Sequence, residues 1–349
     1  MTIASLTNVV VQLTPTDFDR IKLTPGLGRS FFTTFITAVP QLVYDLAGNF
    51  MLTIYNSDAL IVTTFVPLYI PLAPVGVTLD VNSSTLGITY PDLIDLNTIY
   101  PRAVTFQSLA DNASNRYTLS ALSSVVKNSR FAVTIVISID ISDMNTMKSM
   151  YPLISRQSHT FISYASSLAK DWFGNQLLAI NSSYAFEVTT FIPNFTPPQV
   201  TRYALDMNRG LIELTVSEAV DPMTTNLYDV NLQSLPSIRF AAFTNLVGAE
   251  VSAGSGSESN VVDIALSNTT LTFLKFNHIG NLLKTSYLTF SPGFISDYSG
   301  LGVNPAYDSS VFGNSYVSQA EYLTLLFECR WESSSSPYLH IGHHSSQFN

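Results

Sequence analysis

The chain repeats itself with a spacing of 126 residues. Asp45, Asp171 and Asp297 each open a D-x-x-G segment, and neighbouring copies are 126 residues apart. In the same register, ALIVTTFVPLYIP at 59–71 recurs as AFEVTTFIPNFTP at 185–197, with seven of 13 residues identical. Because chance does not preserve one offset across separate segments, the chain must be built from copies of one supersecondary unit.

This period divides the chain unevenly. Residues 1–72 match only the second half of a unit, whereas 73–198 and 199–303 each match a complete unit. The match is lost in residues 304–349. We therefore predict an N-terminal half-repeat, two complete repeats and a C-terminal tail outside the repeat.

Each unit is expected to be a β-sandwich. Several short segments alternate or run apolar with β-branched residues and are separated by turn residues, and no long segment has a period of 3.6. The predicted strands are Phe131–Ile139, Leu211–Val216, Val261–Leu266, Ser286–Phe290 and Phe31–Ile36. The sequence thus predicts an all-β protein of tandem Ig-like β-sandwich units with a 126-residue period.

The composition excludes one class of partner. Charged residues make up only 12% of the chain, about half the roughly 25% of typical soluble domains, and the net charge is −9. No cluster of Lys and Arg exists to neutralise phosphates, which argues against nucleic-acid binding. A surface of uncharged hydroxyl and amide groups is typical of secreted, glycosylated proteins.

No membrane span or disulfide framework is expected. The uncharged stretch at 59–77 holds three prolines, and its copy contains Glu187, so we reject a transmembrane helix. Cys329 is the single cysteine. The opening MTIASLTNVVVQL lacks the features of a signal peptide, so a secreted protein would be represented here by a mature or truncated form.

Two short motifs carry a family resemblance. LTVSEAVD at 214–221 and the related ITYPDLID at 88–95 open the complete units. A D-x-x-G-N turn closes each copy, at Asp45–Asn49, Asp171–Asn175 and, without its Asn, Asp297–Gly300. In these motifs the chain resembles the Ig-like repeats of the bacterial S-layer family and the repeat arrays of secreted protist and algal surface and filament proteins. The resemblance implies an extracellular structural or adhesive role.

Motifs of catalysis and metal binding are missing from the sequence. It contains no HExxH, GxSxG, P-loop or EF-hand pattern. We expect no enzyme, no cofactor and no metal site; a carbohydrate-active enzyme would need a paired-carboxylate cleft, of which the scattered acids give no local sign. His340, His343 and His344 suit a transition metal, but we favour a polar terminus. The recurrent aspartates suit Ca²⁺ at unit junctions, but we favour hydrogen bonds to their own turns.

Five N-glycosylation sequons are present, no more than chance supplies. They stand at Asn82, Asn112, Asn181, Asn194 and Asn268. Asn82, in a predicted turn, is the expected acceptor if the chain passes through a eukaryotic secretory route.

The two ends of the chain are complementary. The N-terminal half-repeat lacks opening strands, and the tail offers a strand at Tyr322–Trp331 whose one face is Leu323, Leu325, Phe327, Cys329 and Trp331. We hypothesise that this donor strand adds to the half-repeat of a neighbouring copy, which would give a helical or linear homopolymer. Three alternatives remain: the tail pairs back onto 199–303, residues 1–72 form a self-sufficient sandwich, or the sequence is part of a longer array.

The sequence therefore predicts a secreted structural protomer of an extracellular filament or cell-surface appendage. It would assemble head to tail from copies of itself, with covalently attached glycans as a second class of partner, and without nucleic acid or a membrane span. The alternative is a monomeric cell-surface adhesin or stalk that binds glycan or protein through loop tips. Self-association separates the two.

Overall fold

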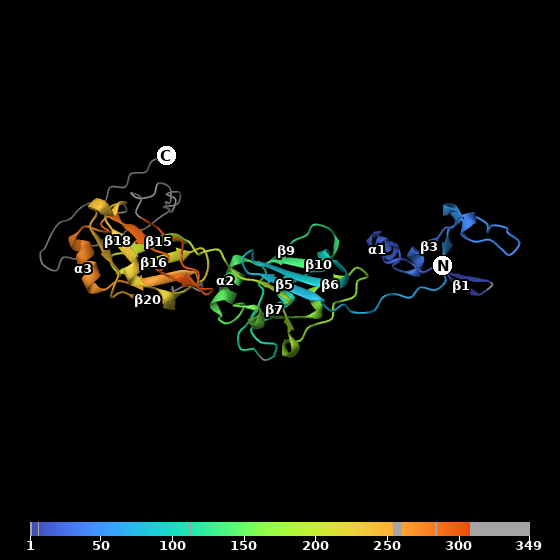
Figure 1. Ribbon diagram of the computed structural model, residues 1–349, viewed down its shortest axis with the longest axis horizontal. Helices are drawn as coiled ribbons and strands as arrows, with labels where there is room; N and C mark the ends of the chain where they lie inside the picture. Colours follow the sequence, from blue (N-terminus) through green and yellow to red (C-terminus); the bar gives the residue numbers. More distant parts are fainter. Residues whose placement is uncertain (1, 6, 112, 254–259, 283–284, 308–349) are drawn as a thin grey trace, which may run out of the picture. The chain divides into compact units, whose positions relative to one another are not determined.

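The computed structural model describes residues 2–5, 7–111, 113–253, 260–282 and 285–307. The chain divides into two compact units, Met1–Asn194 and Phe195–Asn349 (Figure 1). Strands dominate both units, mostly in antiparallel sheets, and the described α-helices have only nine residues each. The predicted all-β class is confirmed. No described helix is long and apolar enough to cross a membrane.

The first unit begins with the half-repeat. Its elements are β1 (Thr2–Ser5), β2 (Asn8–Val10), α1 (Pro15–Leu23), β3 (Phe35–Ile36) and β4 (Leu60–Ile61). β1 pairs with β2, and β3 pairs with β4, both antiparallel.

The complete repeat of the first unit is a sandwich of two sheets. One sheet has the order β14-β5-β6-β10-β9, with β12 also paired to β6, and the other has the order β13-β11-β7-β8. The elements are β5 (Gly76–Asp80), β6 (Thr85–Asp95), β7 (Val104–Gln107), β8 (Arg116–Thr118), β9 (Ser124–Val125), β10 (Phe131–Ser138), α2 (Ile141–Ser149), β11 (Phe161–Tyr164), β12 (Lys170–Asp171), β13 (Phe186–Glu187) and β14 (Thr190–Ile192).

The second unit repeats this arrangement. Its sheets have the orders β15-β16-β21-β20, β19-β18-β22 and β17-β23. The elements are β15 (Val200–Asp206), β16 (Leu211–Val216), β17 (Val220–Asp221), β18 (Val230–Gln233), β19 (Phe243–Asn245), β20 (Glu250–Ala253), β21 (Val261–Ala265), α3 (Asn268–Phe276), β22 (Tyr287–Phe290) and β23 (Ser296–Asp297).

Strand pairings recur in one register along the chain. Phe35 pairs with Ile61 in the half-repeat, and Phe161 pairs with Glu187 in the complete repeat, each 126 residues further on. Isolated bridges recur three times in the same way, as Ala38–Ile54, Tyr164–Ile180 and Phe290–Ala306. Homologous positions of the three copies can therefore be compared one by one.

Each complete repeat has its own apolar core. In the first unit the core lies between residues 72 and 188, where alternate residues of β5, β6 and β10 face those of β7 and β11. In the second unit the core lies between 200 and 306. Among the described residues of the half-repeat, no apolar side chain before Leu72 is buried.

The structure differs from the predicted strands at two kinds of place. The described residues include three α-helices that were not predicted, each with a side-chain N-cap: Thr14, Asp140 and Ser267. Nine residues make two and a half turns, too few to give a clear 3.6-residue period. The predicted strand Phe31–Ile36 is extended only at Phe35–Ile36, because Phe31–Thr33 forms a 3-10 turn after Ser30.

The D-x-x-G turns are held by their aspartate. In the complete repeat Asp171 Oδ1 accepts the backbone N–H of Phe173, Gly174 and Asn175 at 2.9, 2.7 and 2.8 Å. Its Oδ2 accepts from the Asn175 amide at 2.8 Å. Gly174 has a φ of 104°, a conformation that side chains other than hydrogen disfavour. The carboxylate thus replaces the backbone partners that a tight turn lacks.

Replacing this aspartate tests how much the turn stabilises the repeat. Asp171→Ala removes a buried acceptor of four hydrogen bonds and is expected to lower the free energy of unfolding by about 2–3 kcal/mol. Asp45→Ala, in the exposed copy of the same turn, is expected to cost less than about 1 kcal/mol. Urea unfolding followed by tryptophan fluorescence measures both; equal losses would contradict the account.

Candidate assembly interface

The half-repeat exposes positions that are buried in the complete repeat. Ile36 is 53% exposed, whereas Ile162, its counterpart 126 residues later, is fully buried. Leu42 is 42% exposed and its counterpart Leu168 is fully buried. The apolar pattern of a core is therefore present in residues 1–72, but the strands that would cover it are absent from that part of the fold.

A polar position shows the same contrast. Asp143 on α2 is fully buried and accepts from Tyr117 Oη at 2.7 Å, Ser120 N at 3.0 Å and Ser123 Oγ at 2.6 Å. Burial, and then the bond to Asp143, raise the pKa of the Tyr117 hydroxyl to about 12. Asp17, the counterpart on α1, is exposed and accepts from the hydroxyl of Thr14. The half-repeat keeps this aspartate without the loop that encloses it in the complete repeat.

Missing neighbours explain the exposure. In the complete repeat β11 lies between β13 and β7. Its counterpart β3 pairs, in the described part of the chain, with β4 alone. The β3 edge therefore presents unpaired backbone groups, and such edges favour pairing with another chain.

A second pair of edges borders the position of an absent hairpin. In the complete repeat β5 and β6 lie between β14 and β10. Residues 64–66 are the counterpart of β14, and residues 5–12 are the counterpart of β10. Val9 and Val11 are exposed, whereas Ile135 and Ile137, 126 residues later, are fully buried. The half-repeat thus keeps the residues that correspond to both neighbours of a β5–β6 hairpin, although 64–66 lie outside any strand and Asn8–Val10 is paired with β1.

The β14–β5 pairing shows what the first of these edges binds. β14 is parallel to β5, with Phe191 opposite Leu79. Thr189 fixes the register, because its hydroxyl accepts from Val77 N at 3.0 Å and donates to Val77 O at 2.8 Å. Residues 62–66, VTTFV, differ from residues 188–192, VTTFI, only at the last position. Thr63 therefore has the sequence context to make the two hydrogen bonds that Thr189 makes with Val77.

The half-repeat also contacts the complete repeat of its own unit. Lys22 Nζ lies 2.7 Å from Asp92 Oδ1 and 4.5 Å from the centroid of the Phe18 ring. The Phe18 ring meets the Trp172 ring edge-on at 6.3 Å, and Arg29 donates to the carbonyl oxygen of Trp172. The tip of the Asp171 turn is thereby covered by α1.

The carboxylates of the aspartate turns accept hydrogen bonds from their own turns and are not grouped as metal ligands. The Asn49 side chain and the turn N–H groups hold the pKa of the Asp45 carboxyl below its usual value. Asp297 Oδ1 accepts from the N–H of Ser299 and Leu301. No group of three or more potential ligands occurs among the described residues. Each carboxylate binds its own turn, the arrangement favoured from the sequence.

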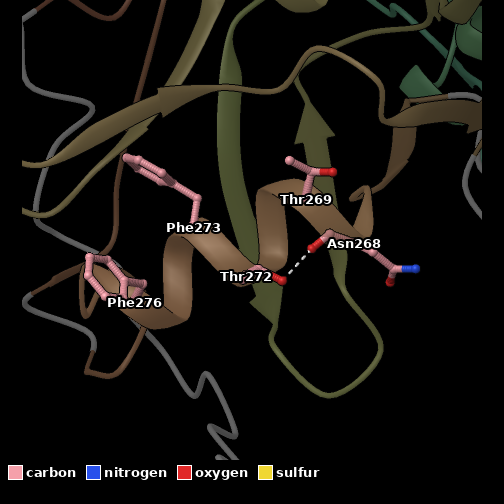
Figure 2. Close-up of a pocket in the computed structure, with 5 residues that line it drawn as sticks. All are labelled: Asn268, Thr269, Thr272, Phe273 and Phe276. Atoms are coloured by element: carbon pink, nitrogen blue, oxygen red, sulfur yellow. Dashed lines mark hydrogen bonds between the residues drawn. The ribbon is translucent and has the colours of Figure 1, made fainter.

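An apolar hollow lies beside α3. Asn268, Thr269, Thr272, Phe273 and Phe276 line it, and Figure 2 shows both rings projecting from the C-terminal half of the helix. The Thr272 hydroxyl donates to the Asn268 carbonyl at 2.8 Å. This hollow was not predicted from the sequence, because the helix that carries it was not predicted.

The predicted glycosylation sites differ in solvent exposure. Asn181 and Asn268 are exposed, Asn82 is half-buried in the turn between β5 and β6, and Asn194 is only 8% exposed. Asn112 lies outside the described residues, as do His340, His343, His344 and all five donor-strand residues. The donor strand therefore stays a prediction.

Comparisons with known proteins give only weak similarities. No protein-family model and no curated protein matches the sequence. The N-terminal part of the bacterial S-layer protein SbsC is 12% identical with a TM-score of 0.23, covering 57% of this chain and 45% of that one. A marsupial T cell receptor is 10% identical with a TM-score of 0.15, covering 57% of this chain and 61% of that one. At these scores neither similarity carries an argument about function.

Substitutions of equivalent isoleucines in the complete repeat and the half-repeat test whether the half-repeat lacks a closed core. Ile162→Ala leaves a cavity in a closed core and is expected to cost about 2–5 kcal/mol of unfolding free energy. Ile36→Ala is expected to change the stability of the dilute, unassembled chain by less than about 0.5 kcal/mol. Denaturant unfolding at low protein concentration measures both, and a large loss for Ile36→Ala would show that residues 1–72 already close a core.

Burial also ranks the sequons. Expressed through a eukaryotic secretory route, the chain is expected to carry glycan on exposed Asn181 and little on Asn194, whose side chain the folded protein encloses. Glycopeptide mass spectrometry measures the occupancy of each site. Higher occupancy at Asn194 than at Asn181 would contradict the described burial.

Proposed function

We propose that this chain is a secreted structural protomer that assembles head to tail into an extracellular filament or appendage, without catalysis. The tail of one copy would complete the half-repeat of the next by β-strand addition. The observation that carries the proposal is the exposure of Ile36 and Leu42 where Ile162 and Leu168 are fully buried. A low content of charge and a surface of uncharged polar groups suit an extracellular location.

Outside the repeat match, part of the tail is still similar in residue type, without identity at the aligned strand positions, to the hairpin that the half-repeat lacks. Cys329, Trp331 and Glu332 stand 252 residues after Val77, Leu79 and Asp80 of β5. Four serines follow Glu332, and then Leu339 and Ile341 alternate as Leu86 and Ile88 do in β6. We place this segment between residues 64–66 and 5–12 of a neighbouring copy, in the order that β5 and β6 have between β14 and β10.

The donor face would bury its large residues in the half-repeat. Trp331 would occupy the position of Leu79, which is fully buried in the complete repeat. Each large apolar residue contributes about 1.5–3 kcal/mol on full burial, against about 4–15 kcal/mol for association. Trp331, Leu339 and Ile341, with the exposed residues of the acceptor, reach that range, and ladder hydrogen bonds add to it.

Two buried carboxylates are fully used in structural hydrogen bonds, which suits a role without catalysis. Asp143 is buried and saturated with donors, and Asp171 is occupied by its own turn. Such acids stabilise folds rather than transfer protons to a bound molecule. A structural function needs no further chemistry from them.

A disulfide to the single cysteine tests the placement. In the proposed register Thr63 meets residue 329 as Thr189 meets Val77, and adjacent strands lie about 4.8 Å apart, within the Cα range of a disulfide. A chain with Thr63→Cys and Cys329→Ser, mixed with the unaltered chain and mildly oxidised, is expected to give a cross-linked pair on a non-reducing gel. Because each partner has one cysteine, only a contact between copies can form it.

Thr37→Cys with Cys329→Ser is the matched control. Thr37 follows β3, whose counterpart lies in the other sheet of the sandwich, so the proposed register predicts no cross-link. A cross-link from position 37 instead of 63 would contradict the register. A full chain that remains monomeric and binds glycan would favour the adhesin.

A further inference from the structure

A pocket lies where the half-repeat meets the Asp171 turn of the complete repeat. Its apolar walls are Phe31, Phe65, Pro67 and Tyr69 of the half-repeat and Phe173 of the turn, around a volume of about 440 Å³. Phe31 and Tyr69 are 43% and 74% exposed, so the pocket is open to solvent. A pocket of this size lined by exposed aromatic rings indicates a binding site.

Contacts between the two repeats hold the walls of this pocket in place. The Phe65 and Phe173 rings are stacked, with their centroids 6.3 Å apart and their planes 14° apart. The Asn175 side-chain amide donates to the carbonyl oxygen of Leu68 at 2.8 Å, which ties the segment after Phe65 to the turn. The pocket is therefore formed before anything binds to it.

The complete repeat shows what lies beside Phe65 in a closed unit. Phe191 is the counterpart of Phe65, 126 residues later, and it pairs with Leu79 of β5. Residues paired across two strands have their side chains on the same face of the sheet. Accordingly, Phe191 packs against the core that contains the fully buried Leu79. A strand added beside Phe65 would thus place one side chain on the face where Phe65 lines the pocket.

We infer that this pocket receives the side chain of Trp331 from a second copy. The inference rests on the proposed function, in which part of the tail takes the position that β5 has in the complete repeat. Trp331 stands 252 residues after Leu79. In that register Trp331 would lie opposite Phe65, as Leu79 lies opposite Phe191.

The chemistry of the pocket suits an indole ring. Aromatic rings bind one another in stacked or edge-on contacts and bury a large apolar area. Arg29, which also lines the pocket, already donates to the carbonyl oxygen of Trp172, so an apolar occupant leaves this cation paired. Alternation along the added strand would place the charged residues Arg330 and Glu332 on the other face, away from the pocket.

This contact extends the assembly interface beyond the half-repeat. Phe173 belongs to the complete repeat, and the corresponding residue of the half-repeat turn is Ala47, which has no ring. The two repeats of the acceptor would therefore bind the donor together, and the ring that distinguishes the complete repeat's turn would contact the neighbour.

Substitutions on both sides test the contact in the full chain. Phe173→Ser removes a wall of the pocket and is expected to raise the dissociation constant of self-association, measured by sedimentation, at least about tenfold. Trp331→Ala is expected to act in the same direction, and the double variant to act no more strongly than the stronger single variant, because both changes remove one contact. Tyr55→Ser is the control and should leave the dissociation constant unchanged, because Tyr55 and its counterpart Asn181 are both exposed.

A cross-link separates this inference from the proposed function. Chains with Phe173→Cys and Trp331→Cys, both with Cys329→Ser, are mixed above the dissociation constant and treated with a short bis-maleimide; mass spectrometry is expected to find a linked 173–331 peptide pair. Tyr184→Cys, at an exposed tyrosine of the complete repeat outside the pocket, replaces Phe173→Cys as the control and should give no link.

Two results would overturn the inference in different ways. An intact 63–329 disulfide, with no 173–331 link and unchanged association of Phe173→Ser, would overturn this contact and leave strand addition standing. Loss of that disulfide and of all self-association would overturn both.

Discussion

The burial of apolar side chains between two sheets is the interaction on which the rest of this structure depends. In the complete repeats it is satisfied within one repeat, where β5, β6 and β10 close over β7 and β11. In the half-repeat the same residue pattern has no opposing strands, and Ile36, Leu42 and Leu46 remain in water. A chain with this arrangement exposes apolar side chains of the half-repeat, and its own complete repeats show how such side chains are buried.

Polar groups in the chain follow the same logic. Asp171 and Asp143 are enclosed where their donors are present, and Asp45 and Asp17 occupy the same positions in the half-repeat without that enclosure. The half-repeat therefore keeps polar as well as apolar features of a closed unit. This is why we assign its missing part to a strand-forming segment of another copy, which would restore the neighbours of both kinds of residue.

The sequence predicted more of the fold than of the interface. Alternating runs such as Leu211–Val216 gave correct strands because each side chain's burial follows from its place along the strand. The helices were missed because their nine residues show their caps more clearly than their period. Ile36 and Ile162 are identical in type, and only the strand beside each decides its burial. The contact between Phe18 and Trp172 brings together residues from separate elements and leaves no local pattern to find. The hollow on α3 was missed together with the helix whose residues line it.

The most direct measurement of the central claim is the association state of the full chain beside a chain that ends at Ser315. Sedimentation with negative-stain microscopy resolves both species under the same conditions. Donor-tail assembly predicts filaments or rings from the full chain and monomers from the shortened one. Monomers from both, or equal assembly by both, would contradict it.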